Sequence, residues 1–269
     1  MKIIHEEVNG IRIGVYKDLE GEGPVLTFIH GFPGQISNWK YQLEYFRGKF
    51  SLVAYDQRGF GTSDKPERVS FKEYLSDLEA LLRKLGLKDE DVVLIGHSFG
   101  GMVSEWYAGA HPVKGLVLIG SLVEMKPDVT DRIIWHLPPF LWKPPLFSDN
   151  FLTRRLYRKM FFSPSTPEEV FKDFMRDNKE YIESLPAHVF RYSRYYVNHS
   201  AEEALKRIKC PTLIIVGEDD VVTPPRESER IHRLVPNSKL IVLERSGHMV
   251  LYEKPDEINQ LIENFVKEL

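Results

Sequence analysis

Residues 91–108 read DVVLIGHSFGGMVSEWYA, and this stretch decides the fold. Positions 91–95 form a short, mostly apolar and β-branched run, which indicates a buried strand. Positions 101–108 contain no helix breaker before Gly109 and indicate a helix. Ser98 lies at the corner between the two, where a tight turn lifts a serine hydroxyl clear of the backbone. Glycines two residues to either side leave room for this turn, because a Cβ there would clash with the crossing strand and helix. The sequence therefore predicts that Ser98 is a nucleophile.

The bulk composition is that of an ordinary soluble globular protein, with 42% apolar and 28% charged residues in a chain of 269. A net charge of −3 gives no electrostatic reason to expect nucleic acid or an anionic membrane as a partner. The single cysteine, Cys210, excludes an internal disulfide and any multi-cysteine metal site. Acidic residues follow Met1 too early for a signal peptide, and no apolar run approaches the ~18–20 residues that span a bilayer. We therefore expect a cytoplasmic protein, with a homodimer left open.

Strands and helices alternate along most of the chain. Short apolar runs indicate further strands at 3–8, 11–16, 25–29, 51–55, 115–119, 212–216 and 240–243. Helical spacing is found at 39–46, 71–85, 226–234 and 256–267. The first two strands flank Asn9-Gly10, a strong signal for a two-residue hairpin turn. This alternation predicts an α/β protein with a mostly parallel sheet covered by helices on both faces.

The segment 123–209 does not keep this alternation. It carries two Pro-Pro pairs and many aromatic residues, with helical stretches between them. An aromatic-rich insertion after a sheet strand suits a helical cap over a binding crevice. We therefore predict a core made of 1–122 and 210–269, with 123–209 as the cap. Most of the aromatics are expected to form the cap's own small core, and Trp135 and Trp142 are candidates for binding substrate.

A serine nucleophile needs a base, and nine histidines compete for that role. His248 lies in a loop just beyond the last predicted strand, and α/β sheets assemble their sites at the carboxyl ends of parallel strands. His30 and His97 also lie near predicted site residues. Each is adjacent to a residue whose position shapes the site, Gly31 for His30 and Ser98 for His97. We interpret both as structural. His248 is therefore the predicted general base.

The base in turn needs an acid that fixes its tautomer and stabilises the imidazolium. Glu218, Asp219 and Asp220 follow the strand at 212–216. An acid three residues after Gly217 can fold back toward the histidine, which favours Asp220 over Asp219. Glu124, just past the strand at 115–119, is a further candidate. The alternative to a catalytic role for these acids is a solvent-exposed acidic turn, and we expect this for Glu218.

The tetrahedral intermediate of acyl transfer needs N–H donors directed at its oxyanion. One predicted donor is the backbone N–H of Phe99, directly after the nucleophile. The other is that of Phe32, in the glycine-flanked loop after the strand at 25–29. Pro33 cannot serve, because it has no N–H.

Five stretches together resemble the α/β-hydrolase superfamily, in the branch with a helical cap. They are His30-Gly31-Phe32-Pro33-Gly34, Asp56 to Ser63, Gly96 to Gly101, Gly217 to Pro224, and Gly247-His248. The order of serine, acid and histidine is also that of the superfamily. The resemblance implies an eight-stranded sheet, no cofactor, and acyl transfer from serine to water. The sequence has no H-E-x-x-H pattern, so we expect no metal site.

Within the superfamily the motifs favour a carboxylesterase that acts on a small-molecule ester. Epoxide hydrolases and haloalkane dehalogenases share the early motifs but use an aspartate nucleophile where this chain has Ser98. Proline iminopeptidases are similar at Asp56-Gln57-Arg58-Gly59, but usually have glycine where Phe32 stands. A carbon–carbon bond or lactone hydrolase, an acyltransferase or a perhydrolase remain alternatives. Outside enzymes, a ligand receptor on the same fold is the competing hypothesis.

Overall fold

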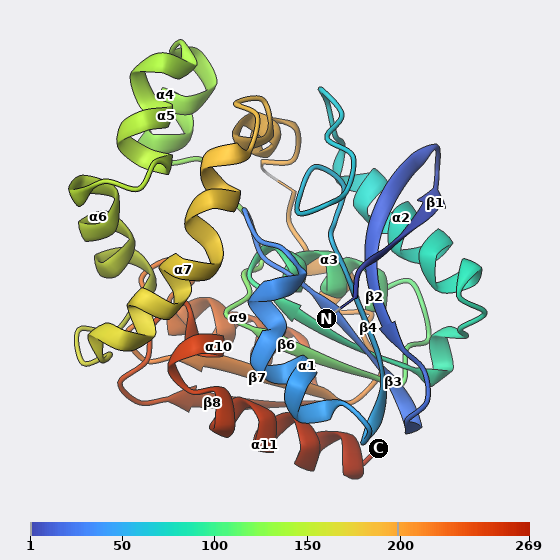
Figure 1. Cartoon of the computed structure of the whole chain (residues 1–269). Helices are drawn as coiled ribbons and strands as arrows, with labels where there is room; N and C mark the ends of the chain where they lie inside the picture. The colour runs from blue at the N-terminus through green and yellow to red at the C-terminus, as the bar shows by residue number, and fades with distance from the viewer. Residues whose placement is uncertain (1, 198) are drawn as a thin grey trace.

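The computed structural model describes residues 2–197 and 199–269, which form one eight-stranded sheet with helices on both faces (Figure 1). The strands are β1 (Ile4–Val8), β2 (Ile11–Asp18), β3 (Glu22–Ile29), β4 (Phe50–Tyr55), β5 (Val92–His97), β6 (Gly115–Ile119), β7 (Thr212–Gly217) and β8 (Ser238–Leu243). Their order is β1-β2-β4-β3-β5-β6-β7-β8. Only the pairs β1–β2 and β2–β4 are antiparallel, so the prediction of an eight-stranded, mostly parallel sheet is confirmed.

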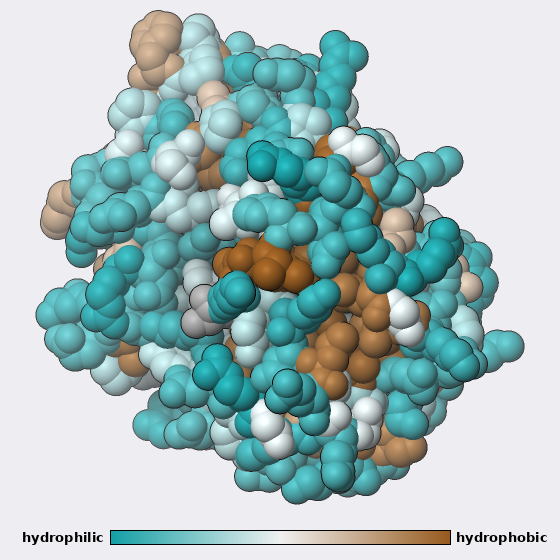
Figure 2. All heavy atoms as spheres, turned by 45° about the vertical axis from the view of Figure 1, so that its right-hand side comes forward, coloured by the Kyte–Doolittle hydropathy of each residue, from teal (hydrophilic) through white to brown (hydrophobic). Residues whose placement is uncertain are grey.

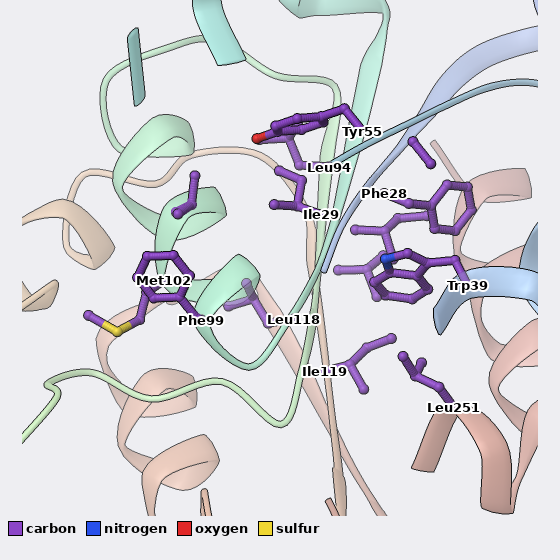
Figure 3. Packing of buried hydrophobic residues seen from close by; sticks show 14 of the residues in the cluster. Phe28, Ile29, Trp39, Tyr55, Leu94, Phe99, Met102, Leu118, Ile119 and Leu251 are labelled. Carbon is purple, nitrogen blue, oxygen red and sulfur yellow. The ribbon is translucent and has the colours of Figure 1, made fainter. Parts of the chain in front are cut away.

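Two layers of helices cover the sheet. The helices that follow the core strands are α1 (Lys40–Phe46), α2 (Phe71–Lys84), α3 (Phe99–Ala108), α9 (Pro225–Leu234), α10 (Val250–Glu253) and α11 (Pro255–Lys267), with short 3-10 turns η1 (Ile36–Trp39) and η2 (Asp89–Asp91). Helices α1 and α11 pack together on one face, and α2 and α3 pack together on the other. Figure 3 shows Phe28 and Trp39 on one side of the sheet and Phe99 and Met102 on the other, all buried. Burial on both faces explains why the parallel strands read as continuous apolar runs.

The predicted hairpin forms as expected. Strands β1 and β2 pair around Asn9 and Gly10, whose φ angles are +49° and +78°. Two successive positive φ angles are the requirement of the turn that matches the twist of a hairpin, and asparagine and glycine tolerate them best. This edge of the sheet is therefore specified by two adjacent residues.

Between β6 and β7, residues 120–197 and 199–211 contain six further helical elements. They are α4 (Val129–His136), α5 (Pro139–Phe147), α6 (Phe151–Phe161), α7 (Glu168–Ser184), η3 (Val189–Tyr195) and α8 (Glu202–Leu205). We call residues 123–209 the insertion. Figure 1 shows α4, α5 and α6 standing out beyond the sheet, while α7 extends from beside α10 toward α5. The division of the molecule into a core and a cap with these bounds stays a prediction.

The surface is mostly polar, as the 28% of charged residues leads one to expect. Figure 2 shows a face that is mostly hydrophilic, with hydrophobic residues gathered near its centre. Within the described part of the chain, every helix is too short or too polar to cross a lipid bilayer.

Candidate active site

Ser98 occupies the corner between β5 and α3. Its φ and ψ angles are +53° and −120°, and its N–H donates a hydrogen bond to the carbonyl of Ile119 at 2.9 Å. A Cβ at Gly96 would lie 2.5 Å from the carbonyl oxygen of Gly100, and a Cβ at Gly100 would lie 2.1 Å from that of Ile29. No side chain fits at either position without moving the backbone. The two glycines therefore allow the strand and the helix to cross closely enough for Ser98 to sit at the corner and line the cavity.

Asp220 and His248 come from the loops that follow β7 and β8. Nδ1 of His248 lies 2.8 Å from Oδ2 of Asp220, and both side chains are buried. The other carboxylate oxygen, Oδ1, accepts hydrogen bonds from the backbone N–H groups of Val222 and Thr223 at 2.9 and 2.8 Å. Burial acts to raise the pKa of Asp220, but His248 and the Thr223 donors outweigh burial and lower it. A carboxylate at Nδ1 keeps the proton on that nitrogen and leaves Nε2 free to accept one.

Ser98 and His248 line the same cavity, which has about 80 Å³ of water-accessible space. Among the residues that the structure describes, none forms a hydrogen bond with the Ser98 hydroxyl. Such bonds are often long in enzymes without substrate and tighten when substrate binds. The geometry brings together the predicted nucleophile, base and acid, whose catalytic roles stay predictions.

The competing acids lie elsewhere. Asp219 accepts a hydrogen bond from the Ser163 hydroxyl at 2.5 Å, and Glu218 accepts one from the Arg245 backbone at 3.1 Å. Glu124 lies 3.4 Å from the Lys126 ammonium. Of the four acids considered from the sequence, Asp220 is the one that contacts His248.

The two predicted oxyanion donors flank the nucleophile. Phe32 lies in the loop after β3 and lines the cavity, and Phe99 is the first residue of α3. A Cβ at Gly31 would lie 3.0 Å from the Cβ of Ser98, so this loop passes directly over the nucleophile. Neither Phe32 nor Phe99 uses its backbone N–H for a hydrogen bond within residues 2–197 and 199–269. The role of both N–H groups as oxyanion donors stays a prediction.

His30 and His97 each serve a structural hydrogen bond. Nε2 of His30 accepts from the Gln57 N–H at 3.0 Å, so its Nδ1 carries the proton and donates to the Gly31 carbonyl at 2.7 Å. Nε2 of His97 donates to the backbone carbonyl of His248 at 2.9 Å. Burial, together with the neighbouring His248, lowers the pKa of His97 to about 3, and burial also lowers that of His30. Both imidazoles are neutral and hold the site loops in place.

The apolar side chains of the cavity wall are mostly aromatic, and most of them come from the insertion. The wall's apolar side chains beyond Phe32 include Phe147, Tyr157, Phe161, Phe174, Ile182 and Met249, and its side-chain amides are Asn38 and Asn178. Apart from Phe32, none of these residues is predicted from the sequence. The many aromatics of the insertion give no signal in sequence of which ones face inward.

Trp135 and Trp142 do not line this cavity, contrary to the expectation from sequence. The indole N–H of Trp142 donates to the Leu137 carbonyl at 3.0 Å, and its buried ring packs against Phe190. The indole N–H of Trp135 donates to the Ser193 hydroxyl at 3.0 Å. Both indole N–H groups thus find an acceptor within the insertion, as the buried ring of Trp142 and the half-buried ring of Trp135 require.

Comparison with known proteins gives one fold family and relatives that are named as hydrolases. A family model described as "alpha/beta hydrolase fold" matches residues 24–255. Human epoxide hydrolase 4 is 28% identical over 97% of this chain and 77% of its own length. The proline iminopeptidase of Thermoplasma volcanium is 28% identical over 92% of this chain and 90% of its own length. Among solved structures, a thermophilic esterase from Thermogutta terrifontis superposes with a TM-score of 0.83 at 24% identity, covering 100% of this chain and 99% of that one. At that identity the superposition shows the fold alone.

Proposed function

The chain belongs to the α/β-hydrolase fold family, and from this we propose that it is a serine hydrolase of small carboxylic esters. Membership of the family makes the protein a hydrolase, while the ester preference and the serine mechanism are the proposal. The observation that carries it is the contact of 2.8 Å between His248 and Asp220, made at the cavity that Ser98 also lines.

In the proposed mechanism, Nε2 of His248 takes the proton of the Ser98 hydroxyl while Oγ attacks the carbonyl carbon of the ester. The negative charge that develops on the carbonyl oxygen is stabilised by the N–H groups of Phe32 and Phe99. Asp220 keeps the imidazole in the required tautomer and stabilises its positive charge. His248 then protonates the departing alcohol, and the same steps with water release the acid. No step requires a cofactor.

The competing iminopeptidase activity is less well supported by the cavity. An enzyme that binds a free N-terminal ammonium needs an acceptor of matching charge, since charged hydrogen bonds to carboxylates are the strong ones. Among the described residues that line the cavity, none is an aspartate or a glutamate. For epoxide hydrolysis, Ser98 stands where the family resemblance requires an aspartate. Ester hydrolysis needs neither a cation site nor a carboxylate nucleophile.

The size of the cavity supports a short acyl group. A single water needs about 10–15 Å³ of such space, so about 80 Å³ holds the equivalent of roughly six waters. Aromatic rings from the insertion form part of its wall, including those of Phe147, Phe161 and Phe174. A long acyl chain would have to displace these rings.

A series of p-nitrophenyl esters tests the proposal. We expect kcat/KM to be highest for acetate and butyrate and at least about tenfold lower for dodecanoate, because binding energy is lost when the wall must move. A fluorophosphonate probe is expected to label Ser98, whereas a receptor that has lost turnover would stay unlabelled. Rapid cleavage of a proline arylamide with no hydrolysis of any ester would contradict the esterase assignment.

The pH dependence gives a second test. Activity is expected to fall at low pH because a protonated His248 cannot accept the Ser98 proton. His97 does not contribute to this fall, since its pKa of about 3 keeps it neutral. His97→Gln is therefore expected to leave the midpoint of the acid limb unchanged, with only a modest loss of turnover, because glutamine can still donate to the His248 carbonyl. The measurement is kcat/KM against pH, and a displaced acid limb in the variant would reject this assignment.

A further inference from the structure

The loop that carries Phe32 is held at several points by the core. We call residues 31–36, which follow β3, the oxyanion loop. At its start, His30 donates to the Gly31 carbonyl, and the Gly34 N–H donates back to the same carbonyl at 2.9 Å. At its end, the Ile36 N–H donates to Asp56 at 2.8 Å. Between these points lies the segment that includes the carbonyl of Gly34.

That carbonyl is bound by a side chain from the insertion. The hydroxyl of Tyr181, on α7, donates to the Gly34 carbonyl at 2.7 Å and accepts from the Gly61 N–H at 3.0 Å. One hydroxyl thus joins the oxyanion loop to the turn after β4, and both of its partners are backbone groups. Burial raises the pKa of Tyr181 far above its ordinary value, so the hydroxyl keeps the proton that it donates. Gly34 is two residues from Phe32, whose N–H is the predicted oxyanion donor.

Helix α7 is itself held to the core by side-chain contacts. The ammonium of Lys40 lies 2.5 Å from Asp173 and 2.7 Å from Asp177, one turn apart on α7. The Tyr252 hydroxyl donates to Asp177 at 2.9 Å. At the next residue of α7, the amide oxygen of Asn178 accepts a hydrogen bond from the amide nitrogen of Asn38 at 2.8 Å. Tyr181 therefore extends from a helix whose position relative to the core is held by several polar contacts.

We propose that Tyr181 is a positioning residue for catalysis, a hydroxyl from the insertion that fixes the oxyanion loop through the Gly34 carbonyl. The inference rests on the proposed serine hydrolase function. The Phe32 N–H contributes to rate only if it points at the oxyanion of the tetrahedral intermediate, and small displacements of such donors are costly. The ground-state ester does not need this donor to bind. Loss of the hydrogen bond from Tyr181 to the Gly34 carbonyl is therefore expected to lower kcat and to leave KM little changed.

The test compares Tyr181→Phe with Tyr41→Phe. Each substitution removes one hydroxyl that joins the core to α7, but Tyr41 donates to Asp173 at 2.5 Å, away from the oxyanion loop. For Tyr181→Phe we expect kcat for p-nitrophenyl acetate to fall about tenfold. Its inhibition constant for phenylboronic acid, which forms a tetrahedral adduct on serine, is expected to rise by the same factor. Tyr41→Phe is expected to keep kcat close to the wild-type value.

The outcomes separate this inference from the proposed function. If the wild type hydrolyses esters and is labelled at Ser98, but Tyr181→Phe matches Tyr41→Phe in kcat, the positioning role is rejected. A change confined to KM would also reject the positioning role, because the Tyr181 hydroxyl would then act on substrate binding. A wild type without ester hydrolysis or labelling would overturn the proposed function and this inference with it.

Discussion

Replacing Ser98 with alanine is expected to lower ester turnover by about 10⁴- to 10⁶-fold without unfolding the protein. The substitution removes only the attacking oxygen, and the Cβ that the corner already accommodates stays in place. Among the residues described, none depends on the Ser98 hydroxyl for a hydrogen bond, so no buried partner is left unsatisfied. The strained φ of +53° is the same for alanine as for serine.

The measurement is kcat for p-nitrophenyl acetate, with the thermal unfolding midpoint as the control. The midpoint should stay near that of the wild type, and labelling by the fluorophosphonate should disappear. A variant that kept a tenth of the wild-type activity would show that Ser98 is not the nucleophile.

Asp220→Asn is expected to lower turnover by about 10⁴-fold. Asparagine has nearly the same shape, but its amide can donate to Nδ1 of His248, which moves the imidazole proton to Nε2. The base then faces Ser98 with a proton already in place. The variant also lacks the negative charge that stabilises the imidazolium during the reaction.

Asp219→Asn is the matched control, because the two aspartates are adjacent in sequence. Asp220 contacts His248, whereas Asp219 contacts the Ser163 hydroxyl. We expect Asp219→Asn to retain most of the activity, and Glu124→Gln to be nearly silent. If Glu124→Gln proved damaging and Asp220→Asn mild, the acid would be misassigned.

The sequence predicted the regular elements well where the signal is local. The strand expected at 115–119 coincides with β6, and the hairpin turn forms at Asn9 and Gly10. Strand β5 runs two residues further than expected, to His97, because His97 still pairs with Ile119 of β6. Pairing with a neighbouring strand is not visible in the local pattern, so element ends were less well predicted than element types.

The cavity wall could not be predicted in this way. Trp135 and Trp142 are the largest aromatics of the insertion, yet Phe161 and Phe174 line the cavity instead. All lie on amphipathic or apolar helical stretches, and only the packing of α4 to α7 against one another decides which face turns inward. The contact between Asn38 and Asn178 joins residues 140 positions apart, and no pattern in either segment signals it.

The sequence by itself determined the α/β class, the tight corner at Ser98 and the strand ends from which an acid and a histidine would come. These features depend on backbone sterics and apolar periodicity within a few residues, which each short segment carries on its own. Only the tertiary structure decided which acid meets His248, which rings enclose the cavity and which hydroxyl holds the oxyanion loop. Those contacts join segments 28 to 147 residues apart. Their positions follow from the sum of many weak packing contacts over the whole core, which no single segment encodes.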